Sequence, residues 1–253
     1  MIWRLGVAGH PVGHSLSPVL HEAGLAQLGL TGSSRRVDAR GVGELAAVLG
    51  SFDGLSITMP LKGVARALCD EVDDVVGRTG MVNSLALGGG RVRGANTDGR
   101  GLLDALDAHG WAPRGARVAV LGAGGAAWSI VEALVGAGAR VAVSTRRPEA
   151  LVALRALDAH IEALADGGAA DLVVQTVPVG RRGGAPTVRP AGPHAIAVDI
   201  TYEPRVSPWL AEHGARGWIT MNGLPMLAYQ AARQLTWWLG APVDGAALAR
   251  TLA

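Results

Sequence analysis

The sequence predicts an α/β protein, in which a first α/β unit precedes a doubly wound parallel sheet and helices close the chain. Two observations carry this prediction. Short apolar runs, each as long as one buried strand, alternate with helix-length segments along most of the chain. One of these runs, residues 117–121, ends in a glycine-rich turn that leads into the next helix. Apolar residues form 49% of the 253 positions, which supplies a sizeable core and excludes a disordered chain.

The chain opens with a strand, a polar loop and a helix. Residues 2–8 are apolar enough for a buried strand, and residues 9–17 follow as a loop. Ser17 and Pro18 are typical of a helix start, with Ser17 as the N-cap and proline at the first helical position. A helix over 18–29 is therefore expected.

The next strand is expected at residues 55–59. Its alternation places Ser56 and Thr58 on one face. Pro60 ends the strand and predicts a helix start, which would leave Lys62 in the first turn of that helix.

A hairpin is expected around residues 81–95, since three consecutive glycines separate two strand-like runs. Folding the chain about these glycines brings Asn83 nearly opposite Asn96. Asp98 then leads into a helix over 99–109, so polar side chains from separate loops can converge in this part of the chain.

The second half repeats strand and helix in a regular way, which is typical of a parallel, doubly wound sheet. A strand over 117–121 is followed by a glycine turn and a helix to about residue 137. Further strands are expected at 140–144, 171–175, 195–200 and 217–220. Further helices are expected at 41–50, 223–239 and 244–252.

Composition limits the kinds of protein that the chain can be. Net charge is +2 and no basic block is present, so we expect no nucleic-acid partner. The sequence shows no run of about 18 apolar residues and no signal-peptide pattern at its start, so we expect no membrane segment and a cytoplasmic location. The single cysteine, Cys69, excludes an internal disulfide. The histidines form no recognised ligand set, so no metal is assigned. We expect a monomer or a homodimer.

The single lysine, Lys62, is a candidate for chemistry. The chain has 23 basic residues, and all the others are arginine. Codon bias explains the scarcity of lysine, yet arginine cannot replace a titratable amine. Reduction of a carbonyl by hydride leaves an alkoxide that must gain a proton, and Lys62 suits the role of donor.

The glycine turn after residues 117–121 has the pattern of a dinucleotide site. Gly122, Gly124 and Ala127 follow the GxGxxA variant between a strand and a helix, as in a Rossmann-type domain. The alternative is a turn that only packs tightly. The cofactor-binding residues expected in this turn are Gly122, Ala123, Gly124, Gly125 and Ala126.

The end of the next strand indicates the choice of cofactor. NAD sites usually place an acidic residue about 20 residues beyond the glycine turn, to accept from the ribose 2′-hydroxyl. Ser144, Thr145, Arg146 and Arg147 stand here instead. Hydroxyls with two guanidiniums suit a 2′-phosphate, so we expect NADP. The alternative is a pair of solvated arginines.

Four short motifs, in order along nearly the whole chain, resemble those of the shikimate dehydrogenase family, within the wider shikimate/quinate dehydrogenase superfamily. Residues 9–18 match its Gly-x-Pro-x-x-His-Ser-x-Ser-Pro loop. Residues 57–62 match its Val-Thr-x-Pro-x-Lys stretch, with isoleucine for valine, and residues 96–99 match its Asn-Thr-Asp-Gly stretch. Residues 226–231 match its Met-Leu-x-x-Gln-Ala tail.

The resemblance implies reversible, NADPH-dependent reduction of 3-dehydroshikimate to shikimate, on the route to chorismate and aromatic amino acids. It implies that Lys62 and Asp98 are the catalytic pair. The substrate-binding residues that it implies are Ser15, Ser17, Thr58, Asn83, Tyr202 and Gln230. Gly223 and Met226 would lie near the nicotinamide.

The resemblance also implies a split architecture with the site between the domains. Residues 1–100 would form a substrate-binding catalytic domain and residues 101–222 the dinucleotide-binding domain. Residues 223–253 would return as helices to the first domain.

Other interpretations stay open from the sequence. Ser56 stands where the family usually has asparagine, so one amide contact to the substrate would become a shorter hydroxyl contact. A relative acting on quinate or aminoshikimate, with NAD as the cofactor, has much the same motifs. A non-catalytic protein that senses a dinucleotide is a further alternative, although such a protein needs no proton-transfer pair. Serine, threonine, asparagine and aspartate at these positions also occur as plain turn, strand and cap residues.

Overall fold

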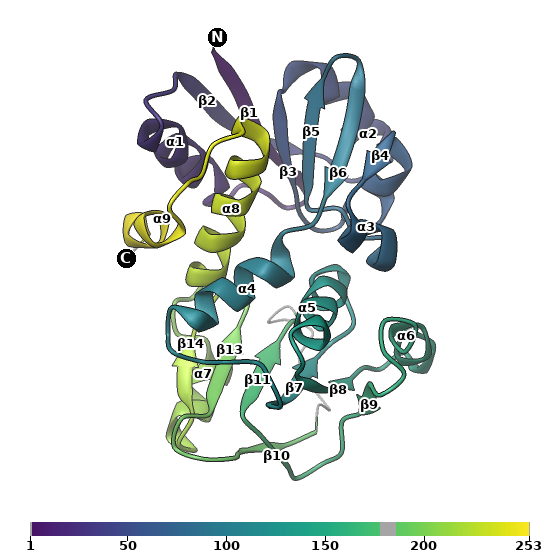
Figure 1. The fold of residues 1–253 in the computed structure, drawn as a ribbon, viewed down its shortest axis with the longest axis vertical. Helices are drawn as coiled ribbons and strands as arrows, with labels where there is room; N and C mark the ends of the chain where they lie inside the picture. Colours follow the sequence, from purple (N-terminus) through teal and green to yellow (C-terminus); the bar gives the residue numbers. More distant parts are fainter. Residues whose placement is uncertain (1, 178–185, 253) are drawn as a thin grey trace. The chain divides into compact units, whose positions relative to one another are not determined.

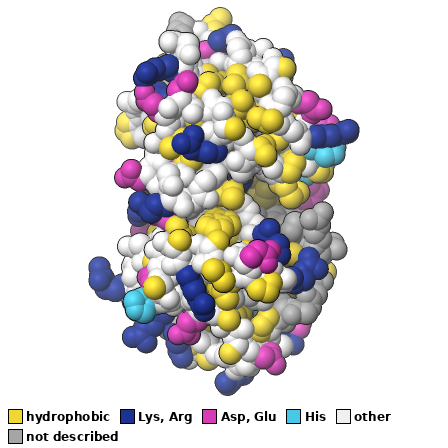
Figure 2. Space-filling view, turned by 90° about the vertical axis from the view of Figure 1, so that its right-hand side faces the viewer, with side chains coloured by type: hydrophobic (Ala, Val, Ile, Leu, Met, Phe, Trp, Pro, Cys, Tyr) yellow, Lys and Arg dark blue, Asp and Glu magenta, His cyan; other side chains and the backbone are white. Residues whose placement is uncertain are grey.

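A computed structural model describes residues 2–177 and 186–252. The chain divides into two compact units, Met1–Gly101 together with Leu227–Ala253, and Leu102–Met226. The C-terminal helices therefore belong to the first unit, as the predicted fold class requires. In the described parts, no helix is long and apolar enough to cross a membrane. Basic and acidic side chains are interspersed over the face shown in Figure 2.

The first unit is built on a mixed sheet with the strand order β2-β1-β3-β5-β6-β4. Its strands are β1 (Trp3–Gly9), β2 (Gly32–Asp38), β3 (Gly54–Ile57), β4 (Glu71–Val72), β5 (Ser84–Gly88) and β6 (Arg91–Ala95). Its helices are α1 (Ser17–Gln27), α2 (Val42–Val48), α3 (Asp74–Thr79) and α9 (Gly245–Thr251), with short 3-10 turns η1 (Leu49–Ser51) and η2 (Val64–Leu68). The β5–β6 hairpin is confirmed, and Ser84 pairs with Ala95 in it.

Strand β2 was not predicted from the sequence. It pairs in parallel with β1 at the edge of the sheet, and its sequence GSSRRVD is mostly polar. An edge strand needs few apolar side chains, so its hydrophobic pattern is weak.

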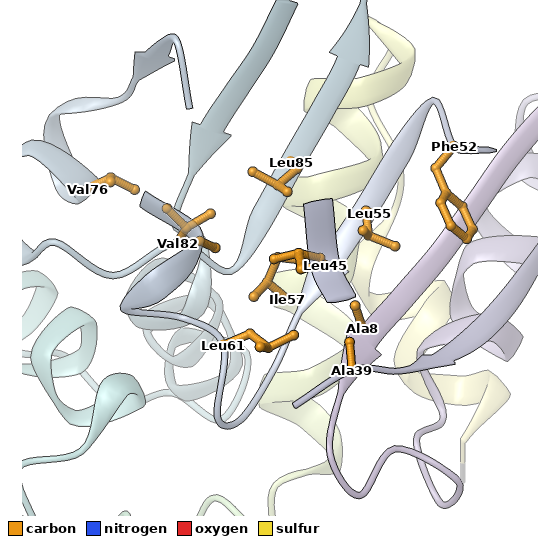
Figure 3. Packing of buried hydrophobic residues seen from close by; sticks show 11 residues of the cluster. Ala8, Ala39, Leu45, Phe52, Leu55, Ile57, Leu61, Val76, Val82 and Leu85 are labelled. Carbon is orange, nitrogen blue, oxygen red and sulfur yellow. The ribbon is translucent and has the colours of Figure 1, made fainter. Parts of the chain in front are cut away.

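Strand β3 is buried on both faces. Leu55 and Ile57 point into an apolar cluster that also contains Leu45 and Leu61. Figure 3 shows the side chains of Leu45, Leu55, Ile57 and Leu61 close together. The opposite face carries Ser56, so this serine lies on the side of the sheet away from that cluster.

The second unit contains a parallel sheet with the order β14-β13-β11-β7-β8-β9 (Figure 1). Its strands are β7 (Arg117–Leu121), β8 (Arg140–Ser144), β9 (Glu162–Ala163), β11 (Leu172–Gln175), β13 (Ile196–Asp199) and β14 (Ile219–Met221). Its helices are α5 (Gly125–Gly136), α6 (Pro148–Leu154) and α7 (Pro208–Ala215), and β10 (Gly168–Ala170) pairs with β12 (Val188–Pro190). The chain runs outward from β7 to β8 and then returns to β11 on the other side. The carboxyl end of β7 is thus a topological switch point, where ligands of such sheets bind.

Two predicted helix starts are wrong in detail. Helix α1 begins at Ser17 itself, its N-cap is Leu16, and no side chain caps it. Lys62 lies in a turn before η2 and not in a first helical turn, because the helical turns begin only at Val64. A proline after a strand therefore produced a turn here, and the following helix is short and of the 3-10 type.

Helices α4 (Asp98–Asp107) and α8 (Leu224–Leu239) approach each other closely at one glycine. A Cβ atom placed on Gly101 would lie 2.5 Å from Cβ of Gln230 and 2.6 Å from its backbone nitrogen. Since these are atoms of another helix and not the end of a flexible side chain, only glycine permits this approach. Gly101 thereby allows α8 to bring Gln230 beside the start of α4.

We expect Gly101→Ala to lower the free energy of unfolding by about 1–3 kcal/mol, because the new methyl group overpacks the crossing. Thermal or denaturant unfolding measures this change. The control is Gly77→Ala in α3, where a Cβ meets nothing within 4 Å. That substitution gains helix propensity and should leave stability equal or higher. Equal stability of both variants would contradict the packing argument.

Candidate functional site

The first unit brings Lys62 and Asp98 into direct contact. Lys62 Nζ donates to Asp98 Oδ2 at 2.6 Å. The two side chains are 16% and 7% exposed, so the ion pair is largely shielded from water. One strand end and one helix start supply the pair, since Lys62 follows β3 and Asp98 begins α4. An ammonium group with three donors keeps two N–H bonds free of this contact.

Asn83 holds the other oxygen of Asp98. Asn83 Nδ2 donates to Asp98 Oδ1 at 2.8 Å, and Asn83 Oδ1 accepts from the Thr97 backbone N–H at 2.9 Å. The hairpin register explains the meeting, because Asn83 and Asn96 flank the paired residues Ser84 and Ala95. Both carboxylate oxygens of Asp98 are therefore held, one by Lys62 and the other by Asn83.

Asn96 has a structural role beside this pair. Its Oδ1 accepts from the Asp98 backbone N–H at 2.9 Å, and its Nδ2 donates to the Met81 carbonyl at 2.7 Å. Asn96 thus orients the first residue of α4 and ties it to the hairpin.

Helix α8 adds Gln230 to these hydrogen-bonded side chains. Gln230 Oε1 accepts from Asn83 Nδ2 at 3.1 Å, and its backbone carbonyl accepts from Thr97 Oγ1 at 3.1 Å. Thr97 was not among the predicted site residues, although it lies within the Asn-Thr-Asp-Gly stretch. Its hydroxyl joins α8 to the loop before α4.

Ser15, on the loop after β1, and Ser17, the first residue of α1, lie together. Ser15 Oγ donates to Ser17 Oγ at 3.2 Å, and both residues are buried. Because Ser17 does not cap α1, its hydroxyl is not committed to the helix backbone. Sequence reasoning missed the residue that supports this loop, because no local motif marks it. Arg36 Nε and Nη2 donate to the Ser15 carbonyl at 2.9 and 2.6 Å.

Thr58 and Ser56 differ in their burial and in their hydrogen bonds. Thr58 is half-buried just beyond β3, and its backbone N–H donates to the Ala8 carbonyl at 2.9 Å. Ser56 is buried, and its hydroxyl donates to Gln234 Oε1 at 2.7 Å. A substrate contact through the Ser56 hydroxyl proton, as the sequence suggested, would have to break this bond.

The second unit presents a glycine-rich turn at the carboxyl end of β7. Gly122 has a φ of 112°, and a Cβ there would lie 2.4 Å from Thr176 Oγ1. Gly124 is the N-cap of α5 without a capping side chain, and a Cβ there meets nothing within 4 Å. The first amide N–H groups of α5 have no acceptor within the helix, so they can bind a pyrophosphate as the chain approaches it closely. The residues Gly122, Ala123, Gly124, Gly125 and Ala126 fit a dinucleotide.

The residues after β8 lie beside this turn. Arg147 Nη2 donates to the Ala123 carbonyl at 2.7 Å, and its backbone N–H donates to Thr145 Oγ1 at 3.1 Å. Arg147 is therefore partly used to fix the glycine turn. Arg146 is exposed and Ser144 half-buried, which leaves a guanidinium and hydroxyls that suit a phosphate dianion.

Tyr202, Gly223 and Met226 also belong to the second unit. Tyr202 is half-buried and Met226 is buried. Gly223 passes close to another segment, because a Cβ there would lie 2.1 Å from the Ile200 carbonyl oxygen. The structure leaves the ligand contacts of these three residues a prediction.

Buried Asp199 holds the segment that contains Tyr202. Asp199 Oδ1 accepts from Thr201 Oγ1 at 2.8 Å, and Oδ2 accepts from Ser207 Oγ at 2.6 Å. These bonds lie on both sides of Tyr202, so Asp199 fixes the backbone that carries the tyrosine.

Comparisons with known proteins show to which family the chain belongs. Residues 7–85 match the model of the shikimate dehydrogenase substrate binding domain. A shikimate dehydrogenase (NADP(+)) of Acidiphilium cryptum is 40% identical, over 98% of this chain and 95% of the relative. The chain belongs to the shikimate dehydrogenase family.

Solved structures of this family have the same fold. The Thermus thermophilus shikimate 5-dehydrogenase in complex with NADP(H) and shikimate superposes with a TM-score of 0.86 at 35% identity, covering 98% of both chains. A 5-ketofructose reductase of Gluconobacter superposes with a TM-score of 0.84 at 27% identity, covering 100% of this chain and 98% of the other. The fold therefore also occurs in a reductase named for a different substrate.

We expect Arg36→Met to loosen the loop that carries Ser15 and Ser17. A hydrogen bond from a charged donor contributes about 1.5–3 kcal/mol, so amide exchange over residues 11–17 should speed up about tenfold or more. Hydrogen-exchange mass spectrometry measures this change. The control is Arg35→Met, since the Arg35 guanidinium stacks 4.7 Å from the Phe52 ring centroid instead. Equal exchange in wild type and Arg36→Met would contradict the assignment.

Proposed function

We propose that this member of the family is an NADP-dependent shikimate dehydrogenase, an oxidoreductase that reversibly reduces 3-dehydroshikimate to shikimate. The observation that carries the proposal is the shielded ion pair of Lys62 and Asp98, with the amide of Asn83 on the second carboxylate oxygen. The names of relatives at up to 40% identity over nearly the full chain support the same reaction and cofactor.

Lys62 carries the proton in this reaction. When bound, NADPH supplies a hydride to the carbonyl carbon. Lys62 Nζ donates a proton to the oxygen that gains the negative charge, and it accepts that proton in the reverse direction. Asp98 holds the ammonium group in place, because its Oδ2 is 2.6 Å from Nζ while its Oδ1 is occupied by Asn83.

The remaining predicted residues bind and orient the substrate in this proposal. Ser15 and Ser17 offer two adjacent, buried hydroxyls, and Thr58 offers a third. Hydroxyl and amide donors of this kind suit a small ring that bears hydroxyls and a carboxylate. Gln230 and Tyr202 complete the proposed set of substrate-binding residues.

The two units take different parts of the work. We assign substrate binding to the first unit and dinucleotide binding to the second. The glycine turn at the start of α5 fits the pyrophosphate, and Arg146 with Arg147 fits the 2′-phosphate of NADP. Gly223 and Met226 are proposed to lie near the nicotinamide. A cytoplasmic monomer or homodimer without nucleic acid stays a prediction.

The experiment that tests the proposal is a cofactor-reduction assay with the purified protein. Shikimate with NADP should give a rise in absorbance at a rate well above that with NAD, because a 2′-phosphate pairs with guanidinium groups. Quinate and aminoshikimate serve as alternative substrates in the same assay. Faster turnover of either one would reassign the substrate. No turnover of any of them together with tight NADP binding would replace the enzyme by a dinucleotide sensor.

We expect Lys62→Arg to lower kcat at least about 100-fold, because a guanidinium keeps the charge but does not release a proton near neutral pH. The KM for shikimate should change far less, since a cation remains beside Asp98. Steady-state kinetics separates the two constants. The matched control is Arg66→Lys, an opposite exchange at an exposed position of η2. An unchanged kcat in Lys62→Arg would remove Lys62 from the mechanism.

A further inference from the structure

A line of buried hydrogen bonds begins at the backbone of Asn83 and leads away from the ion pair. Gln234 Nε2 donates to the Asn83 carbonyl at 2.9 Å. Since a carbonyl only accepts, this contact fixes the amide of Gln234 with Oε1 toward Ser56. Ser56 Oγ then donates to Gln234 Oε1 at 2.7 Å. The Asn83 carbonyl thus determines which end of the Gln234 amide donates, and the Gln234 amide determines where the Ser56 hydroxyl proton lies.

His21 ends this line in a single tautomer. His21 Nε2 lies 3.0 Å from Ser56 Oγ, whose proton is already given to Gln234. Nε2 therefore carries the ring proton and donates it, and Nδ1 accepts from Ser34 Oγ at 2.8 Å. The ring is fully buried, and burial lowers the pKa of His21 to about 3, so the neutral ring persists at neutral pH.

The same face of α8 meets all parts of this line. Gln230, Gln234 and Trp238 are spaced four residues apart, so they lie along one side of the helix. Gln230 contacts the Asn83 side chain and Gln234 contacts the Asn83 carbonyl. Trp238 meets the His21 ring edge to face, with ring centroids 5.2 Å apart. His21 thus contacts both Ser56 and the far end of this helix face.

We propose that His21 is a positioning residue for the Lys62–Asp98 pair, acting through Ser56 and Gln234 on Asn83. The inference rests on the proposed function and deepens it. His21 fixes the hydroxyl of Ser56, which fixes the amide of Gln234 against the Asn83 carbonyl. The Asn83 side chain then keeps its bond to Asp98, and α8 keeps Gln230 in register. His21 touches neither member of the ion pair itself.

The test compares two variants of the full chain with the wild type. His21→Phe keeps an aromatic ring beside Trp238 but removes both hydrogen bonds. We expect kcat/KM for shikimate to fall about 10-fold to 100-fold, as for small displacements of a catalytic group. His21→Gln restores an N–H donor toward Ser56 and should regain most of the loss. The KM for NADP should stay at the wild-type value, since the glycine turn belongs to the other unit.

A matched control separates positioning from loss of stability. Gln27 also joins α1 to the C-terminal segment, through two hydrogen bonds with the Asp244 backbone. Gln27→Met removes these bonds without touching the line from His21 to Asn83, so its kcat/KM should equal that of wild type. A His21→Phe variant with lowered Tm but wild-type kcat/KM would overturn the proposal.

A double-mutant cycle tests the route. If His21 acts through Ser56, the loss in His21→Phe/Ser56→Ala should be smaller than the product of the two single losses. Losses that multiply independently would overturn the route. The wild-type rate with shikimate is the separate test of the proposed function, so an inactive wild type would reject that function alone.

The tautomer of His21 tests the hydrogen-bonded line from Asn83 to His21 independently of enzyme activity. Nitrogen-15 NMR of histidine-labelled protein should show the His21 ring with its proton on Nε2 across neutral pH. Ser56→Ala removes the acceptor and should shift this signal, whereas Gln27→Met should leave it unchanged. A ring with its proton on Nδ1, or a charged ring at neutral pH, would overturn the proposal whatever the substrate is.

Discussion

The carboxylate of Asp98 is the group on which the first unit depends, because both of its oxygens are engaged away from water. Oδ2 meets the ammonium group of Lys62 and Oδ1 meets the amide of Asn83. A buried charge is costly unless it is paired and hydrogen-bonded, so the surrounding elements must deliver both partners at once. Strand β3, the β5–β6 hairpin and the start of α4 do so. The same three elements therefore determine both the fold of this unit and the geometry of the proposed catalytic pair.

Helix α8 completes the arrangement from far along the chain. It reaches Asn83 and Thr97 over a separation of more than 130 residues. Two glycines permit the close packing, since a Cβ on Gly101 would strike Gln230 and one on Gly54 would strike Trp238. Ser56 then meets Gln234 across the same face of β3. The small residues of β3 therefore leave the space that the long side chains of α8 fill.

The two units present different physical problems. In the proposed function, the second unit offers backbone N–H groups and guanidiniums, which suit the phosphates of a dinucleotide. The first unit offers hydroxyls, amides and one amine in fixed positions, which suit a small ring that bears hydroxyls. A reductase named for 5-ketofructose shares this fold. In this chain the Ser56 hydroxyl is bonded to Gln234, so it serves the protein interior.

The sequence by itself determined the alternation of strands and helices, the hairpin, the glycine turn after β7 and the pairing of Lys62 with Asp98 as candidates. These features depend on local periodicity, turn chemistry and short motifs. Only the tertiary structure decided the edge strand β2, the turn that holds Lys62, the support of Ser15 by Arg36, and the line from His21 to Asn83. An edge strand carries a weak apolar pattern, and a contact between residues 21, 56 and 234 leaves no periodic trace. Such contacts arise from the packing of distant segments, which a local pattern does not encode.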